Sequence, residues 1–112
     1  MTHTRIFAMR LGTALAMTVG LAATAQAQSQ NATQLHNRAT AAMCSNCHGT
    51  DGRTVEGSAI PSLVGMPNGY HILQMKAFKD GSRPATVMHQ ITKGLTDAQI
   101  DTIATYYAAL KR

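Results

Sequence analysis

The sequence is poor in large aromatic residues: it has no tryptophan, two phenylalanines and three tyrosines among 112 residues. A chain of this length forms one domain at most, and a small domain is only marginally stable on its own apolar burial. Such domains usually need a disulfide, a metal or a partner. The chain has only two cysteines, and a disulfide between them would close a loop too small to stabilise much. We therefore expect something other than side chains to fill part of the interior.

The chain also lacks an uninterrupted apolar run long enough to span a membrane, which takes about 20 residues. Its most apolar stretch, Leu11–Ala25, is interrupted by Gly and Thr. Arg5 and Arg10 precede this stretch and the small residues AQA end it, which is the pattern of a cleaved signal peptide. No Arg-Arg pair is present, so we expect export of the unfolded chain. We predict a signal peptide over residues 1–27, a mature domain over 28–112, and a periplasmic location without a stable membrane anchor.

Charged residues are scarce, with ten Lys and Arg against five Asp and Glu. Without Arg5 and Arg10, the expected mature domain keeps eight basic and five acidic residues, a net charge of +3. The basic residues are scattered from Arg38 to Arg112 and are not interleaved with aromatic residues. This distribution argues against a nucleic-acid-binding surface.

No segment alternates apolar and polar residues for long, so we expect no sheet and predict an all-α fold. The helical spacing of apolar residues predicts helices at about residues 33–43, 68–80, 85–93 and 96–110. Thr96 and Gln99 form the sequence pattern of a capping box at the start of the last helix. The polar residues 28–32 are interpreted as a loose start, and residues 49–69 as a long loop that wraps a bound group.

Two of these helices have a predicted buried face. In the helix over 68–80 the face consists of Tyr70, Leu73, Ala77 and Phe78, and Gly81 is suited to end the helix. In the last helix it consists of Ile100, Ile103, Tyr107 and Leu110.

Both cysteines lie in the stretch AAMCSNCHGTDG, as Cys44 and Cys47, with His48 directly after them. A structural zinc site needs four ligands, and only one cysteine pair is present. A thioredoxin-like dithiol is expected beside a βαβ pattern, which the sequence lacks. A nucleophilic cysteine needs a separate base and does not explain the second cysteine.

Covalent haem attachment uses all three residues at this spacing. Cys44 and Cys47 would form thioethers to the two vinyl groups, and His48 would bind the iron as the proximal ligand. Attachment holds the histidine at high effective concentration near the iron. One covalently bound haem c would also fill the interior that the aromatic residues leave open, and the apo-protein should be largely unfolded.

The sixth iron ligand decides between electron transfer and ligand binding. A methionine raises the potential and favours electron transfer, whereas an open position binds gases or peroxide. Met88 is the predicted ligand because it lies 40 residues after His48, far enough for the chain to cross the haem, and Met66 is the alternative. A second histidine could bind the iron in place of a methionine, and the candidates are His36, His71 and His89. We interpret His36 as out of reach of the iron, and His71 and His89 as solvated surface residues.

The segments CSNCHG, IPSLVG, GYHILQMKAFKDGSRP and LTDAQIDTIATYYAAL together resemble a small class I cytochrome c over nearly the whole mature chain. The resemblance implies three to five helices wrapped around one covalently bound haem, with His48 and Met88 as axial ligands. It also implies that the carbonyl of Pro61 accepts a hydrogen bond from His48, a role that the residues alone do not separate from a plain loop proline. Since the first helix has no aromatic residue, its packing on the last helix must rely on Tyr106 or Tyr107.

Within this class, CHGTDGRTVEGSAIPSLVG and MKAFKDGSRPATVM are similar to the monohaem cytochrome subunit of flavocytochrome c sulfide dehydrogenase. The resemblance implies a non-catalytic subunit that accepts electrons from a flavoprotein sulfide dehydrogenase subunit. The cysteine count agrees, because haem would occupy both thiols and leave none for sulfur chemistry. The alternative is a free monohaem carrier of the c5 or c553 kind that exchanges electrons with other redox proteins, such as a terminal oxidase or a photosynthetic reaction centre.

A function of another class, a haem sensor or peroxidase-like enzyme, requires that Met88 is not a ligand. Peroxide chemistry also needs a distal acid–base group, for which His89 is the only candidate near Met88. We therefore expect an electron carrier and no enzyme. Arg53 and Tyr70 are candidates for haem-propionate contacts, and Lys76, Lys79 and Arg83 are interpreted as a solvated helix face or a docking rim.

Overall fold

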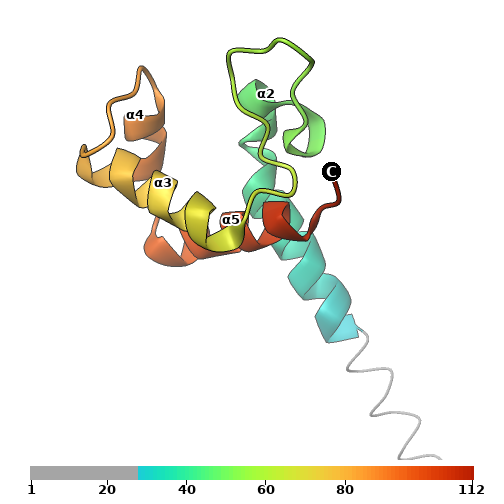
Figure 1. Cartoon of the computed structure of the whole chain (residues 1–112). Coiled ribbons are helices and arrows are strands. Elements are labelled where there is room, and N and C mark those ends of the chain that lie inside the picture. The colour runs from blue at the N-terminus through green and yellow to red at the C-terminus, as the bar shows by residue number, and fades with distance from the viewer. Residues whose placement is uncertain (1–27) are drawn as a thin grey trace, which may run out of the picture. The chain divides into compact units, whose positions relative to one another are not determined.

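The computed structural model describes residues 28–112, and every regular element in this range is a helix (Figure 1). Residues 28–42 are helical, and the elements after them are α2 (Ser45–His48), the 3-10 helix η1 (Thr50–Gly52), α3 (Asn68–Asp80), α4 (Met88–Lys93) and α5 (Asp97–Ala109). The predicted all-α fold class is confirmed. The predicted signal peptide, residues 1–27, lies outside the described residues.

The chain divides into two units with the boundary after residue 35, and α2 to α5 belong to the second, residues 36–112. In the first unit, residues 28–35 are helical, and the Thr33 hydroxyl donates a hydrogen bond to the Ser29 carbonyl at 3.1 Å. The interpretation of residues 28–32 as a loose start is therefore wrong. Ala32 and the glutamines are good helix formers, and a helix whose residues all stay exposed needs no apolar stripe.

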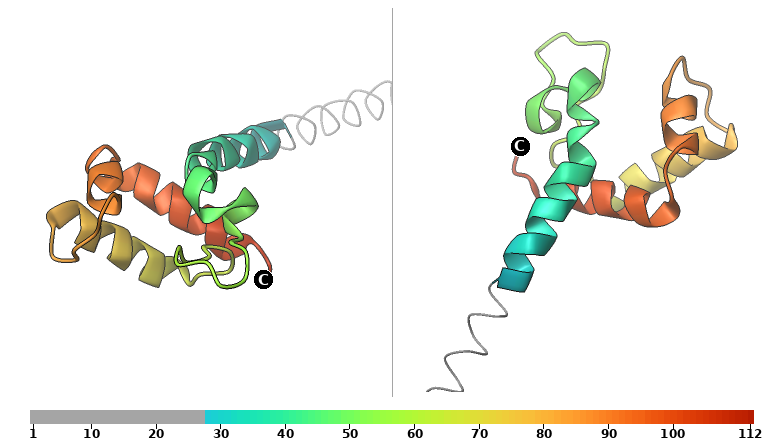
Figure 2. Two further views of the ribbon diagram at one scale, coloured as in Figure 1. Left: turned by 90° about the horizontal axis from the view of Figure 1, so that it is seen from above. Right: turned by 180° about the vertical axis from the view of Figure 1, so that it is seen from behind.

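The last helix, α5, begins as the sequence predicts. The Thr96 hydroxyl accepts from the Gln99 backbone N–H at 3.2 Å, and the Gln99 side chain accepts from the Thr96 N–H at 2.8 Å, which completes the capping box. Ile100, Ile103 and Tyr107 are fully buried, as their spacing predicts. Helix α5 runs alongside α3 in both views of Figure 2. It therefore supplies the centre of the apolar core.

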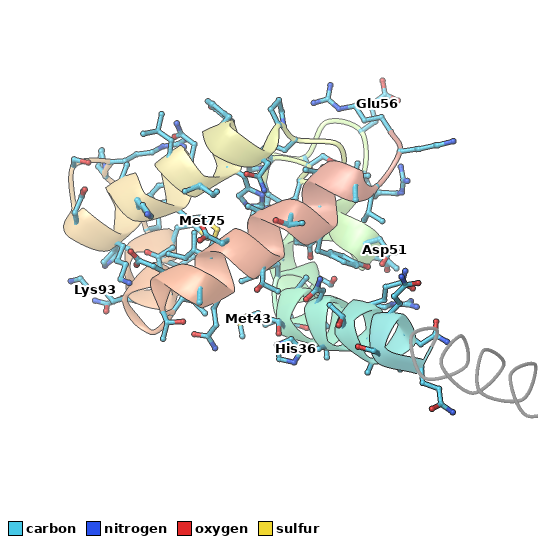
Figure 3. The ribbon with its side chains drawn as sticks, turned by 90° about the horizontal axis from the view of Figure 1, so that it is seen from below. His36, Met43, Asp51, Glu56, Met75 and Lys93 are labelled. Atoms are coloured by element: carbon cyan, nitrogen blue, oxygen red, sulfur yellow. The ribbon has the colours of Figure 1, made fainter. Side chains whose placement is uncertain are left out.

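Helix α3 has the predicted ends, but its buried face differs from the prediction. Gly81 adopts the left-handed conformation that ends the helix. His71 and Met75, four residues apart, are the buried side chains, and Met75 lies between α3 and α5 (Figure 3). Tyr70 and Leu73, which the apolar pattern placed in the core, are 52% and 62% exposed. The prediction was wrong because it counted only apolar residues, and a histidine occupies one of the two central core positions.

Helix α4 is shorter than the predicted helix over residues 85–93, since it begins at Met88. Proline restricts the residue before it and cannot donate to a preceding helical turn, so residues just after Pro84 start in an extended or turn conformation. Val87 precedes the first helical turn with φ −132°, outside the helical range. Met88 is consequently the first residue of the helix.

A tyrosine joins the last helix to the helix that ends at residue 42, where the sequence offers no aromatic partner. The Tyr107 hydroxyl donates a hydrogen bond to the Ala41 carbonyl at 2.8 Å, and both residues are fully buried. The Tyr106 ring meets the Tyr107 ring edge to face at 5.1 Å, and its hydroxyl donates to Asp51 at 3.0 Å. Burial raises the pKa of Tyr107 to about 12, so the hydroxyl keeps its proton and stays a donor. The expected packing through Tyr106 or Tyr107 is confirmed.

Replacing Tyr107 by phenylalanine is expected to lower the free energy of unfolding by about 1 kcal/mol, because one buried hydrogen bond is lost while the ring remains. Urea unfolding followed by far-UV circular dichroism measures this difference. Tyr70→Phe is the matched control, because the Tyr70 hydroxyl makes no hydrogen bond within the described residues, and we expect it to leave the urea midpoint unchanged. Equal midpoints for Tyr107→Phe and wild type would show that the bond to Ala41 contributes nothing.

Asp97, in the first turn of α5, lies 2.9 Å from Lys79 and 3.6 Å from Lys76 on α3. The hydrogen bond and charge of Lys79, with the charge of Lys76, lower the pKa of this carboxyl below its ordinary value of 3.8. A carboxyl whose pKa is lowered by folding stabilises the folded state above its ordinary pKa, and this contribution disappears as the pH falls through the folded pKa.

Asp97→Asn should therefore have a slightly lower urea midpoint than wild type near neutral pH, and the difference should vanish well below pH 3.8. The effect is small because the Asp97 side chain is 64% exposed. Urea midpoints of the two proteins across this pH range provide the measurement. A difference that persists unchanged in acid would mean that the carboxylate charge is not its cause.

Among the described residues, no helix combines the length and apolar character that crossing a bilayer requires.

Candidate functional site

The second unit contains a cavity of about 560 Å³, within the range of about 300–1,000 Å³ that ligand sites occupy. Most of its lining side chains are apolar, and they come from the loop after η1, from α3 and from residues 85–95. Helices α2 and α4 both contribute lining residues, and their ribbons stand apart from each other in Figures 1 and 2. Several apolar lining side chains are 37–52% exposed: Met43, Ile60, Tyr70, Val87 and Ile91. A large flat apolar group in the cavity would cover them.

One wall of the cavity carries both cysteines. Cys44 is the residue before α2 and Cys47 lies in it, so the two side chains are one turn apart. They form no disulfide with each other, and Cys44 is partly buried whereas Cys47 is exposed. Burial raises the pKa of the Cys44 thiol, so it stays protonated and is a poor nucleophile at neutral pH. The pair thus offers two thiols to one cavity, and burial keeps the Cys44 thiol from being activated for nucleophilic catalysis.

His48 ends α2 and faces the same cavity at 8% exposure. Its Nδ1 lies 2.7 Å from the carbonyl oxygen of Pro61, so Nδ1–H donates and the proton is fixed on that nitrogen. The opposite nitrogen, Nε2, then carries the free lone pair that a metal needs. The hydrogen bond therefore holds the imidazole in the tautomer and orientation of a metal ligand.

The turn after His48 is built on glycine. Gly49 has φ +78°, and a Cβ added there would lie 2.1 Å from the carbonyl oxygen of Arg53. Gly52, with φ +73°, leaves no room for a Cβ against the ring of Tyr107 and the side chain of Leu63. Glycine at both positions therefore allows the chain to turn back and bring Pro61 to His48, because a side chain at either position would collide with its surroundings.

Gly49→Ala is expected to destabilise the protein by at least about 1–3 kcal/mol, because the left-handed conformation is strained and the added methyl collides with backbone. Gly57→Ala is the matched control, since Gly57 has the same φ of +78° and nothing within 4 Å of an added Cβ. Thermal unfolding of both variants separates the collision from the cost of the backbone conformation. If both variants melt at the same temperature, the close approach at Arg53 has no energetic consequence.

Met88 lies on the α4 side of the cavity as the first residue of that helix. The buried Thr92 hydroxyl donates to the Met88 carbonyl at 2.8 Å, which fixes the first turn of α4. Met66, the sequence alternative, also lines the cavity, as do Met43 and Met75. The structure thus brings Met88 to the wall opposite α2, and the choice between Met88 and Met66 stays a prediction.

Among the three histidines considered for bis-histidine ligation, His71 differs from its sequence interpretation. His71 is only 4% exposed and lines the cavity, so its interpretation as a solvated surface residue is wrong. Burial first, and then the charge of His48, lower its pKa, so it is neutral at pH 7. Its Nδ1 and that of His89 are buried and have no hydrogen-bond partner within residues 28–112. His36 is exposed and does not line the cavity.

The other side chains singled out in the sequence divide between the cavity and the surface. Tyr70 lines the cavity, whereas the Arg53 guanidinium is hydrogen-bonded to the Lys111 carbonyl and does not. Arg83 also lines the cavity, where it donates to Gln74. Sequence reasoning missed the place of His71, for which the only signal was its four-residue spacing from Met75.

The family model of cytochrome c matches residues 37–111. The chain belongs to the cytochrome c family. It is 41% identical over 71 residues to a thiosulfate dehydrogenase electron acceptor of Thiomonas intermedia (strain K12), over 63% of this chain and 33% of the relative. It is 42% identical over 69 residues to the cytochrome subunit of sulfide dehydrogenase of Chlorobaculum tepidum, over 62% of this chain and 61% of the relative.

A cytochrome c4 structure from Acidithiobacillus ferrooxidans superimposes on this cytochrome with a TM-score of 0.56 and 40% identity, over 60% of this chain and 38% of that one. The fold is thus the class I cytochrome c fold that the resemblance implied. The aligned part spans about a third and about three-fifths of the two curated relatives.

The cofactor of this cytochrome is covalently attached haem c, as in its family. The donor set fits the group: two thiols one turn apart, an imidazole with its Nδ1 held by a carbonyl, and a thioether on the far side of an apolar cavity. The chain is accordingly an electron-transfer protein.

Proposed function

We propose that this cytochrome accepts electrons from the flavoprotein subunit of a periplasmic sulfide dehydrogenase and passes them to a further redox protein. The observation that carries the electron-transfer role is the pairing of Cys44, Cys47 and His48 on one wall with Met88 on the other, across an apolar cavity. The similarity to the cytochrome subunit of sulfide dehydrogenase supports the partner.

In this proposal Cys44 and Cys47 would hold the haem through thioethers, and His48 and Met88 would bind its iron. The Pro61 carbonyl fixes the His48 ring, which raises the basicity of Nε2. Haem c, when bound, supplies a one-electron site whose potential depends on its ligands, hydrogen bonds and burial. The apolar walls exclude water, and Met88 favours the reduced state.

The chain itself has no catalytic part in this function. Both thiols are used in attachment, so sulfide oxidation takes place on the partner. Residues 28–112 are the cytochrome domain, and residues 1–27 direct it to the periplasm as a signal peptide that is then removed. We accordingly place the protein outside the cytoplasm, where haem attachment and sulfide oxidation both occur.

The alternative is a freely diffusing carrier that serves a different donor or acceptor. The similarity to a thiosulfate dehydrogenase electron acceptor favours it, because that relative is matched at nearly the same identity. The two functions differ in whether the cytochrome remains bound to a flavoprotein.

Purification of the affinity-tagged holo-protein from the periplasm of its own organism tests the proposal. We expect a flavin-containing protein to elute with it in a fixed ratio, and sulfide to reduce the haem of the purified complex. Isolation of the chain alone, with full haem content and no response to sulfide, would contradict the subunit function and support the diffusing carrier. The untagged strain is the control for proteins that bind the resin.

A further inference from the structure

The segment of residues 84–94, which carries Met88, is attached to α3 at both ends. At its start, the Arg83 N–H donates to the Ala77 carbonyl at 2.9 Å. The Arg83 guanidinium lies 4.5 Å from the centre of the Phe78 ring and donates to the Gln74 side chain. All three partners lie in α3, so one residue joins the start of the segment to three positions of that helix.

At the other end a second basic residue makes the attachment. Lys79, also in α3, donates to the Leu95 carbonyl at 2.8 Å and to the Asp97 carboxylate at 2.9 Å. Leu95 is buried, with 6% of its surface exposed, and directly follows the segment. Two bonds from one ammonium thus fix the turn between α4 and α5 to α3, and a hydrogen bond to a charged donor is stronger than one between neutral groups.

Between these two attachments the segment is less firmly held. Pro84, Thr86 and Val87 are exposed, Met88 is only partly buried, and Thr92 is the one fully buried side chain of α4. Segments with few buried side chains open more often than the core around them. The two attachments lie at the two ends of residues 84–94, so we expect them to limit how often and how far this segment opens away from α3.

We propose that Arg83 and Lys79 are positioning residues that hold residues 84–94 on α3 and so set how often the Met88 side chain leaves the iron. This inference rests on the proposed ligation by Met88. It also gives both cations a role within the chain, in place of their interpretation as part of a solvated helix face or a docking rim.

Imidazole binding to the ferric holo-protein tests the proposal, because added imidazole can reach the iron only while the methionine is away. Lys79→Met keeps most of the apolar stem and removes the charge, and we expect it to bind imidazole about tenfold faster than wild type. Lys79→Arg should restore most of the wild-type rate. Arg83→Met should act in the same direction as Lys79→Met.

Lys93→Met is the matched control, since Lys93 lies in the last turn of α4, is exposed, and makes no ion pair within the described residues (Figure 3). The methionine-to-iron charge-transfer band of the ferric protein, followed during urea unfolding beside the helical signal, separates local opening from global unfolding. In Lys79→Met the band should disappear at a lower urea concentration than the helical signal does.

Wild-type rates in both Lys79→Met and Arg83→Met, with the band present, would overturn the positioning role and leave the ligation by Met88 intact. If Lys93→Met binds imidazole as fast as Lys79→Met does, the positioning role is also overturned, because the loss of any positive charge would then explain the faster binding. Absence of the band from wild type would overturn the ligation by Met88 and this inference with it.

Discussion

The double substitution Cys44→Ala/Cys47→Ala is expected to yield a colourless and largely unfolded polypeptide. The described chain surrounds an apolar cavity of about 560 Å³ whose lining includes half-exposed apolar side chains. Without the haem these side chains would face water, and a domain of about 85 residues has little other apolar burial to offset the entropy of folding. We expect most of the far-UV helical signal to be lost, together with the haem absorbance.

The matched control is Asn46→Ala, which changes the exposed residue between the two cysteines and keeps both thiols. It should retain haem after denaturing electrophoresis and show the wild-type helical signal. Cys47→Ala should hold the haem through one thioether and give an intermediate stability. A double variant that keeps the native helical signal without haem would show that side chains alone build the interior.

Substitution of Met88 by alanine is expected to open one side of the iron and lower the reduction potential. A thioether ligand favours the reduced state, so its loss should shift the ratio of reduced to oxidised protein by at least tenfold at a fixed potential. For a one-electron couple this corresponds to about 59 mV or more. The methionine-to-iron charge-transfer band should disappear from the ferric spectrum, and carbon monoxide should bind the ferrous protein quickly.

Met66→Leu serves as the control, because Met66 lines the same cavity and is the other methionine that the sequence offers as a ligand. It should keep both the band and the wild-type potential. The reverse pattern, with the band lost in Met66→Leu and kept in Met88→Ala, would assign the sixth ligand to Met66. Retention of the band in both single variants would mean that neither methionine binds the iron.

The features that the sequence predicts well are those set by neighbouring residues. The capping box of Thr96 and Gln99 depends on groups three residues apart. Gly81 can adopt the left-handed conformation that ends α3 because glycine has no side chain. The spacing of Cys44, Cys47 and His48 within one turn likewise fixes their common wall of the cavity. These features can be predicted without knowing which segments of the chain pack against them.

The features that the sequence does not predict depend on contacts between distant segments. The face of α3 was assigned to Tyr70 and Leu73 because apolar residues are normally buried, yet His71 and Met75 occupy the core. The burial of His71 follows from its place beside Tyr107, 36 positions away, at a ring distance of 6.0 Å. Periodicity within α3 carries no information about that neighbour.

The contact between His48 and Pro61 is an intermediate case. The residues alone left Pro61 as either a loop proline or a hydrogen-bond acceptor, and only the resemblance favoured the second. The structure places the carbonyl 2.7 Å from Nδ1. That approach requires Gly49 and Gly52 to turn the chain under α2, which depends on the left-handed conformation of both glycines.

The most direct test of the account is the mass of one tryptic peptide from the exported, purified protein. Cleavage after Arg38 and Arg53 releases residues 39–53, which contain both cysteines and His48. We predict that this peptide is heavier than its sequence by the mass of one haem, and that it absorbs as haem after acid denaturation. The same peptide with two free thiols, recovered from a protein that is folded, would contradict the central claim that a covalently bound haem completes this fold.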